Sequence, residues 1–89
     1  MKAINTTHAP AAIGPYSQAV EANGFVYVSG QLPIDPSTGA FAEGGIQAEV
    51  RQCLTNIKNI LAEAGMEMCD VVKVTVLLAD IASFSVVNE

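Results

Sequence analysis

The Asn23-Gly24 pair restricts the fold of this chain more than any other feature, because it joins two segments rich in strand-forming residues. A two-residue type I′ turn needs a positive φ at both central residues, which Asn and Gly tolerate. Ser17–Ala22 and Phe25–Ser29 are therefore predicted to pair as an antiparallel hairpin, the second with aromatic and β-branched residues. Lys2–Asn5 can add a short edge strand, so the first third of the chain is predicted to form β-structure.

The loop before this hairpin predicts a small-ligand site. Two prolines and a glycine in Ala9–Ala19 constrain the approach of Tyr16 to the strand, and Ser29-Gly30 forms an exposed main-chain corner at the neighbouring strand end. Pre-organised polar groups at the mouth of a sheet are typical of small-ligand sites. The residues alone leave two alternatives open for each group. Tyr16 either binds a ligand or caps a loop, and Gly30 either offers its main chain to a ligand or serves the turn at a strand end.

Ile46–Ala64 carries the clearest helical pattern, with apolar residues three and four positions apart and polar residues, Asn56 among them, on the other face. The apolar residues are Ile46, Val50, Cys53, Leu54, Ile57, Ile60, Leu61 and Ala64. Gly65 follows at the position where a residue in the left-handed conformation ends a helix. A helix with one apolar stripe is expected to lie on a sheet, and we interpret the stripe as core packing.

Val71–Ala79 alternates in the way expected of a strand. Its apolar face is predicted to receive the helix and consists of Val72, Val74, Val76 and Leu78, whereas the mixed opposite face indicates partial cover by another subunit. Phe84 and Val87 start a second helical stripe at which the sequence ends, so residues 1–89 are interpreted as the N-terminal portion of one longer domain. The order of elements predicts an α+β fold, with helices on one face of a mostly antiparallel or mixed sheet.

Charge and composition argue against several classes of function. The net charge is −5 and the four lysines and arginines are scattered, whereas nucleic-acid binding depends on clustered cations that neutralise phosphates. No apolar run approaches the roughly 20 residues of a membrane helix. The N-terminus carries no apolar signal region, so we expect a cytoplasmic protein. Cys53, Cys69 and the lone His8 cannot form the usual zinc ligand set, and both thiols are expected to be reduced.

Four blocks of the sequence resemble the RidA/YjgF family of imine deaminases, once described as translation inhibitors. They are Ile13–Ala19, Val28–Pro33, Gly65 ahead of Asp70–Val76, and Phe84–Glu89, and together they run the length of the chain. The resemblance implies a chorismate-mutase-like α+β fold, assembled as a homotrimer with ligand clefts between subunits. It further implies hydrolysis of reactive 2-imino acids, such as 2-iminobutanoate and 2-iminopropanoate, to 2-oxo acids and ammonia, without metal or organic cofactor.

The same resemblance implies four substrate-binding residues. Tyr16 matches the tyrosine of the family's cleft, Gly30 matches the glycine whose main chain contacts the ligand, Ser29 flanks it, and Asn88 matches an asparagine near the start of the second helix. In the family, the arginine that grips the substrate carboxylate and the glutamate that positions water lie beyond the position of Glu89. The 89 residues are therefore expected to hold about half of an active site and to be inactive alone.

Two alternatives to catalysis stay open. One is a non-catalytic family member that binds a small ligand as a sensor or regulatory partner. The other is the older interpretation as a translation inhibitor or ribonuclease, which the net charge of −5 and the lack of a basic patch disfavour.

Overall fold

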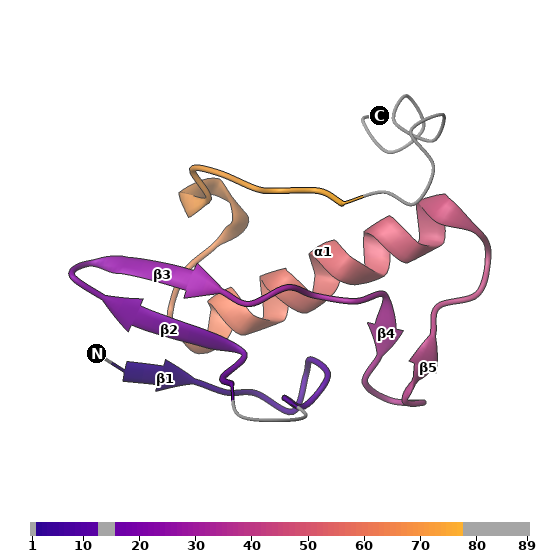
Figure 1. Ribbon diagram of the computed structural model, residues 1–89, viewed down its shortest axis with the longest axis horizontal. Helices are drawn as coiled ribbons and strands as arrows, with labels where there is room; N and C mark the ends of the chain where they lie inside the picture. The colour runs from indigo at the N-terminus through magenta and orange to yellow at the C-terminus, as the bar shows by residue number, and fades with distance from the viewer. Residues whose placement is uncertain (1, 13–15, 78–89) are drawn as a thin grey trace.

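The computed structural model describes residues 2–12 and 16–77 of the chain (Figure 1). Three strands form an antiparallel sheet in the order β1-β2-β3, and two further strands pair as a separate hairpin. The elements are β1 (Lys2–Ile4), β2 (Ala19–Ala22), β3 (Phe25–Val28), β4 (Ile34–Asp35), β5 (Ala40–Phe41), the helix α1 (Ile46–Glu63) and a 3₁₀ turn, η1 (Met68–Asp70). The predicted α+β class is confirmed.

The hairpin between β2 and β3 forms as its turn residues predict. Asn23 and Gly24 have φ values of 53° and 79°, the positive pair that a type I′ turn requires. Ala22 is paired with Phe25 on either side of the turn. The edge strand expected near the N-terminus is also confirmed, because β1 pairs with β2 along its whole length.

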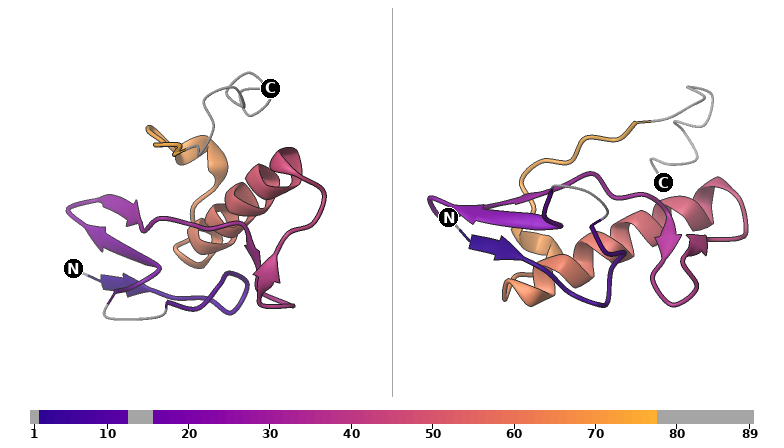
Figure 2. Two further views of the ribbon diagram at one scale, coloured as in Figure 1. Left: turned by 45° about the vertical axis from the view of Figure 1, so that its right-hand side comes forward. Right: turned by 60° about the horizontal axis from the view of Figure 1, so that its bottom comes forward.

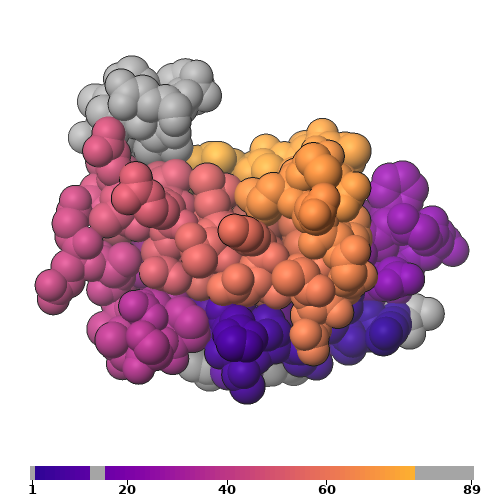
Figure 3. All heavy atoms as spheres, turned by 180° about the vertical axis from the view of Figure 1, so that it is seen from behind, coloured from indigo at the N-terminus to yellow at the C-terminus, as the bar shows by residue number. Residues whose placement is uncertain are grey.

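The core lies between this sheet and α1. The register places Ile4 beside Ala19 and Ala19 beside Val28, so all three point to one face of the sheet. On that face Ile4 and Ala19 are buried with Ala9 and with Ile60 of the helix. The predicted helix is therefore confirmed, and Ile60 and Leu61 of its predicted stripe are buried. Leu54, predicted to belong to the same stripe, is 40% exposed instead. Figure 3 shows the outer surface of α1, with the N-terminal loop packed against one edge of the helix.

The helix ends as Gly65 predicts. Gly65 has a φ of 76°, its N–H donates to the Ala62 carbonyl, and the N–H of Met66 donates to the Leu61 carbonyl over 2.8 Å. This pair of bonds satisfies two carbonyl groups that the helix leaves free at its C-terminus. The turn predicted at residues 35–39 likewise connects β4 and β5.

The strand predicted over Val71–Ala79 is wrong for the part that the structure describes. Residues 71–77 contain no strand, and Val72, expected to face the helix, is 87% exposed. The segment passes beyond β3, on the side away from β2 (Figures 1 and 2). Ile60 and Ala64 of the predicted stripe pack instead against residues of the first three strands and the N-terminal loop. Alternation shows which residues share a face, but a strand also needs a neighbour for its hydrogen bonds.

Some predicted features fall outside the described residues, and others can be checked within them. The second helical stripe predicted from Phe84 and Val87 lies outside them, as do Leu78 and Ala79. No helix in residues 2–12 and 16–77 is long and apolar enough to cross a membrane. Both cysteines are free, as expected, although Cys69 is exposed and only Cys53 is partly buried.

Candidate functional site

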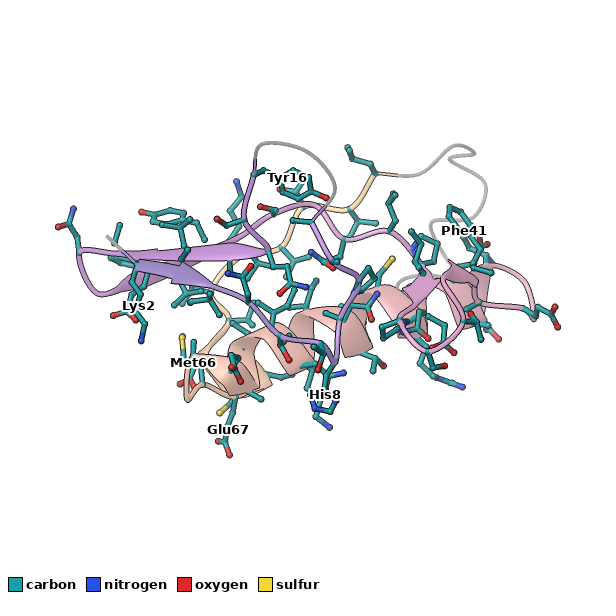
Figure 4. The ribbon with its side chains drawn as sticks, turned by 90° about the horizontal axis from the view of Figure 1, so that it is seen from below. Lys2, His8, Tyr16, Phe41, Met66 and Glu67 are labelled. Carbon is teal, nitrogen blue, oxygen red and sulfur yellow. The ribbon has the colours of Figure 1, made fainter. Side chains whose placement is uncertain are left out.

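Tyr16 lies at the surface on the side of the sheet away from α1. Figure 4 shows its ring on the opposite side of the molecule from His8 and Glu67. The residue is 51% exposed, and its hydroxyl makes no hydrogen bond to the residues that the structure describes. Within that part of the chain, the alternative that Tyr16 caps a loop therefore has no bond to support it.

Ser29 connects the Tyr16 segment to the main-chain corner. Its hydroxyl donates to the carbonyl oxygen of Ser17 over 2.6 Å, and its N–H donates to the carbonyl oxygen of Gln18 over 2.9 Å. These two bonds extend the β2–β3 ladder past the ends of both strands. Because Ser17 directly follows Tyr16 and Gly30 directly follows Ser29, the structure brings the predicted residues Tyr16, Ser29 and Gly30 into one region.

Gly30 offers open main chain at this corner. A β-carbon placed on it would meet no atom within 4 Å, and its φ lies outside the left-handed region. Neither the backbone conformation nor a close neighbour among the described residues therefore requires glycine here, which counts against the turn explanation that the sequence left open. The free space beside the main chain has room for a ligand atom.

The helix supports the segment that follows this corner. Asn56 is fully buried, and its Nδ2 donates to the Leu32 and Ile34 carbonyls over 3.2 and 3.0 Å. Its Oδ1 accepts a hydrogen bond from Gln52 over 2.9 Å. One turn earlier, the Cys53 thiol donates to the Gln31 carbonyl over 3.3 Å. Burial raises the pKa of this thiol, and the negative charge of Glu49 adds to the effect.

The sequence pattern misplaced Asn56, which was predicted to lie on the polar face of the helix. In the structure it lies between Cys53 and Ile60, three and four positions away, so it belongs to the buried stripe. That spacing was the available signal. Gln18 was missed as well: it is 3% exposed, and its side chain holds the loop at residues 6–10 through hydrogen bonds.

A hollow of about 430 Å³ lies on the helix side of the molecule, away from Tyr16. It is lined by Asn5, Thr6, Thr7, His8, Gln18 and Glu63. His8 is held there through its main chain, because Asn59 of α1 donates to the His8 carbonyl over 2.8 Å. Among the described residues, no three His, Cys, Asp or Glu side chains come together as metal ligands. Asn88, the fourth predicted binding residue, lies outside the described residues.

Comparison with known proteins places this geometry in context. Residues 6–89 match the sequence family described as endoribonuclease L-PSP. The chain is 56% identical to the 2-iminobutanoate/2-iminopropanoate deaminase of Bos taurus and 51% identical to that of Homo sapiens. In both comparisons the match covers 99% of this chain and 64% of the relative. The chain thus spans less than two thirds of the length of these relatives.

Solved structures give the same relationship at the level of the fold. The RidA structure from an Antarctic Psychrobacter is similar with a TM-score of 0.93 and 46% identity, over 99% of this chain and 71% of that one. E. coli TdcF with bound serine has a TM-score of 0.93 and 40% identity, over 99% of this chain and 68% of that one.

Proposed function

This chain belongs to the endoribonuclease L-PSP family, which includes the RidA proteins, and from that membership we propose that it forms part of a 2-imino acid deaminase. The proposed substrates are 2-iminobutanoate and 2-iminopropanoate. The observation that carries the proposal is the 51–56% identity to relatives named for this activity, over 97–99% of the chain. Because the chain spans 64% of the bovine relative, the activity proposed is that of the whole protein.

The proposed reaction consumes one water and releases ammonia. The water oxygen attacks the imine carbon, the electrons of the C=N π bond move to nitrogen, and a proton from the water follows them. The resulting carbinolamine then forms the C=O bond as its C–N bond breaks, and the hydroxyl proton leaves with ammonia. Tyr16 is proposed to hydrogen-bond the substrate from the exposed loop. Gly30 contacts it through the main chain, with Ser29 beside it and Asn88 as a further binding residue.

Two parts of this reaction need groups beyond those described. A 2-imino acid carries a carboxylate, for which a guanidinium is the natural partner because it can donate two parallel hydrogen bonds. Arg51 is the only arginine of the chain, and it is exposed on α1. Attack by water also needs a positioned acid or base. We propose that the complete protein adds an arginine and a glutamate for these two roles.

We also propose that copies of the chain assemble as a homotrimer. Ala3, Val20 and Tyr27 lie side by side in the sheet register and point away from the core, and Phe25 shares their face. Phe25 and Tyr27 are 57% and 63% exposed, and the centroids of their rings lie 6.4 Å apart. An apolar sheet face of this kind favours association. Light scattering at micromolar concentration should give a trimer, and a monomer there would contradict the assembly.

A second candidate is small-ligand binding without catalysis. It is favoured by the E. coli relative whose structure holds serine, a small amino acid with the same carboxylate as a 2-imino acid. Both candidates use the same open corner at Gly30. They differ in whether the bound molecule is consumed.

The test of the proposed function compares this chain with a version extended by the C-terminal residues of the bovine relative. An amino-acid oxidase generates the imino acid, and its loss is followed in competition with a trapping amine. The extended chain should accelerate the loss, whereas the 89-residue chain should not. Near-equal turnover by the two would show that the roles are wrongly assigned. An extended chain that binds 2-oxobutanoate but does not hydrolyse the imine would favour the second candidate.

Tyr16→Phe in the extended chain tests the tyrosine hydroxyl. A lost hydrogen bond to a substrate is worth about 0.5–1.5 kcal/mol, so the catalytic efficiency should fall roughly two- to twelvefold. Tyr27→Phe is the matched control, because it removes the same atom from another exposed tyrosine. Equal effects of the two substitutions would contradict the role of Tyr16.

A further inference from the structure

Gln18 is a buried polar residue that the proposed reaction leaves unused. It lies at a bend directly before β2 and is 3% exposed. Its Oε1 accepts a hydrogen bond from the Thr6 N–H over 2.6 Å. Its Nε2 lies 3.1, 3.3 and 2.7 Å from the carbonyl oxygens of Thr6, Ala9 and Pro10. One carboxamide therefore binds the main chain of the loop at four points.

The main chain of the same residue takes part in the corner. The Gln18 carbonyl accepts the N–H of Ser29, and the carbonyl of the preceding Ser17 accepts the Ser29 hydroxyl. Gln18 thus joins three segments: the loop at residues 6–10, the segment that carries Tyr16, and the corner at Ser29-Gly30.

We propose that Gln18 is a positioning residue that holds Tyr16 in register with the Ser29-Gly30 corner. The proposal rests on the proposed function, in which Tyr16 and Gly30 contact one substrate. Tyr16 is half exposed, so packing gives its ring little support, and the proposal assigns its placement to the main chain next to it. Without the carboxamide, three carbonyl groups of the loop lose a donor and must turn toward water. The loop at residues 6–10 is then no longer held beside the segment that carries Tyr16.

Gln18→Glu tests the positioning role of Gln18, because protonation of the introduced carboxyl at low pH should restore a hydrogen-bond donor. The substitution keeps the shape of the side chain but replaces the Nε2 donor with an oxygen. As a carboxylate it faces three carbonyl oxygens, whereas the protonated acid can donate to one of them and still accept from Thr6. Burial and the three carbonyl oxygens close to Nε2 should raise the pKa of the introduced carboxyl, against the single donor that Thr6 offers. The variant should therefore hold Tyr16 normally at low pH and release it as the pH rises.

The readout is ¹⁹F NMR of the 89-residue chain labelled with 3-fluorotyrosine, recorded between pH 5 and 8. The chain has two tyrosines, so two signals are expected, and Tyr16→Phe assigns them. In Gln18→Glu the Tyr16 signal should match the unsubstituted protein at low pH and shift or broaden at high pH. The Tyr27 signal reports the β2–β3 hairpin and should stay constant. Gln47→Glu adds the same charge at an exposed site and is the control.

Three outcomes decide the proposal. A Tyr16 signal that is independent of pH in Gln18→Glu overturns it. Parallel changes at Tyr16 and Tyr27 also overturn it, because they show that Gln18 serves the stability of the whole hairpin. Gln18→Met, which cannot be rescued by protonation, should displace Tyr16 at every pH and provides the second variant.

A ligand experiment separates this proposal from the proposed function. In the extended chain, 2-oxobutanoate should shift the Tyr16 signal, with an affinity about tenfold weaker in Gln18→Glu at pH 8 than at pH 5, relative to Gln47→Glu. Failure of the unsubstituted extended chain to respond to 2-oxobutanoate would count against the proposed function. The pH response of Tyr16 in the absence of ligand would still decide the role of Gln18.

Discussion

The Ser29 hydroxyl lies 2.6 Å from the carbonyl oxygen of Ser17 and donates its proton to it. This bond joins the segment that carries Tyr16 to the corner that presents Gly30, so the two residues proposed to bind the ligand are linked through their neighbours. The hydroxyl proton of Ser29 is already used in this hydrogen bond to the Ser17 carbonyl. Ser29 therefore holds the residue after β3 against the segment that precedes β2.

Removing this bond should weaken the hairpin by a measurable amount. Ser29→Ala leaves a half-buried carbonyl without its donor, and we expect a loss of about 1 kcal/mol in the free energy of unfolding. Urea unfolding followed by circular dichroism measures it. Ser37→Ala is the matched control, because the Ser37 hydroxyl also donates over 2.6 Å, to Asp35, but at an exposed turn. A loss in the control as large as that in Ser29→Ala would contradict the structural role of the Ser29 bond.

Gly30 should tolerate a side chain in the folded protein but not in the bound state. Gly30→Ala meets no atom within 4 Å and needs no left-handed backbone, so stability should be unchanged or higher by about 0.4–1 kcal/mol. The added methyl group occupies the space proposed for the ligand, so binding of 2-oxobutanoate by the extended chain should fall at least tenfold. Calorimetry measures both effects.

Gly24→Ala is the control for this substitution. Gly24 has a φ of 79°, where alanine costs roughly 1–2 kcal/mol, so this variant should lose stability. If Gly30→Ala bound the ligand normally, the contact with the Gly30 main chain would be ruled out.

Asn56 should be the least replaceable polar residue of the helix. Asn56→Leu removes the donor of the Leu32 and Ile34 carbonyls and the acceptor of Gln52. Each buried group left without a partner costs about 1–3 kcal/mol, which approaches the total stability of a domain this small. We expect a largely unfolded variant by circular dichroism. Asn59→Leu, which loses a single bond at an exposed site, should remain folded.

The sequence predicted best those elements whose cause is local. The turn at Asn23-Gly24 and the helix end at Gly65 follow from residues that tolerate positive φ, and both form as predicted. The helix follows from the spacing of its apolar residues, of which Ile60 and Leu61 are buried. In each case the residues that cause the structure lie within a few positions of one another in the sequence.

The wrong predictions concern residues whose structure depends on partners that are distant in the sequence. Val72 belongs to an alternating segment, but the described residues offer it no strand to pair with. Gln18 precedes an inward-facing residue, so alternation would place it outside, yet a bend before β2 turns its side chain into the loop at residues 6–10. The sequence could propose Tyr16 and Gly30 as a candidate site because both flank the hairpin. The residues that hold the site became visible only through their hydrogen bonds.

The two cysteines should differ in their reactivity toward alkylating reagents, because Cys53 is partly buried and Cys69 is exposed. Burial raises the pKa of Cys53, so less of it is thiolate at pH 8, whereas Cys69 is exposed. Iodoacetamide followed by mass spectrometry should modify Cys69 first, with Cys53 several times slower. A thiol with a raised pKa favours the folded state only while protonated, so the contribution of Cys53 to stability should disappear as the pH rises above the ordinary thiol pKa. Cys53→Ala removes this pH dependence, and equal labelling rates for the two thiols in the folded protein would contradict the burial of Cys53.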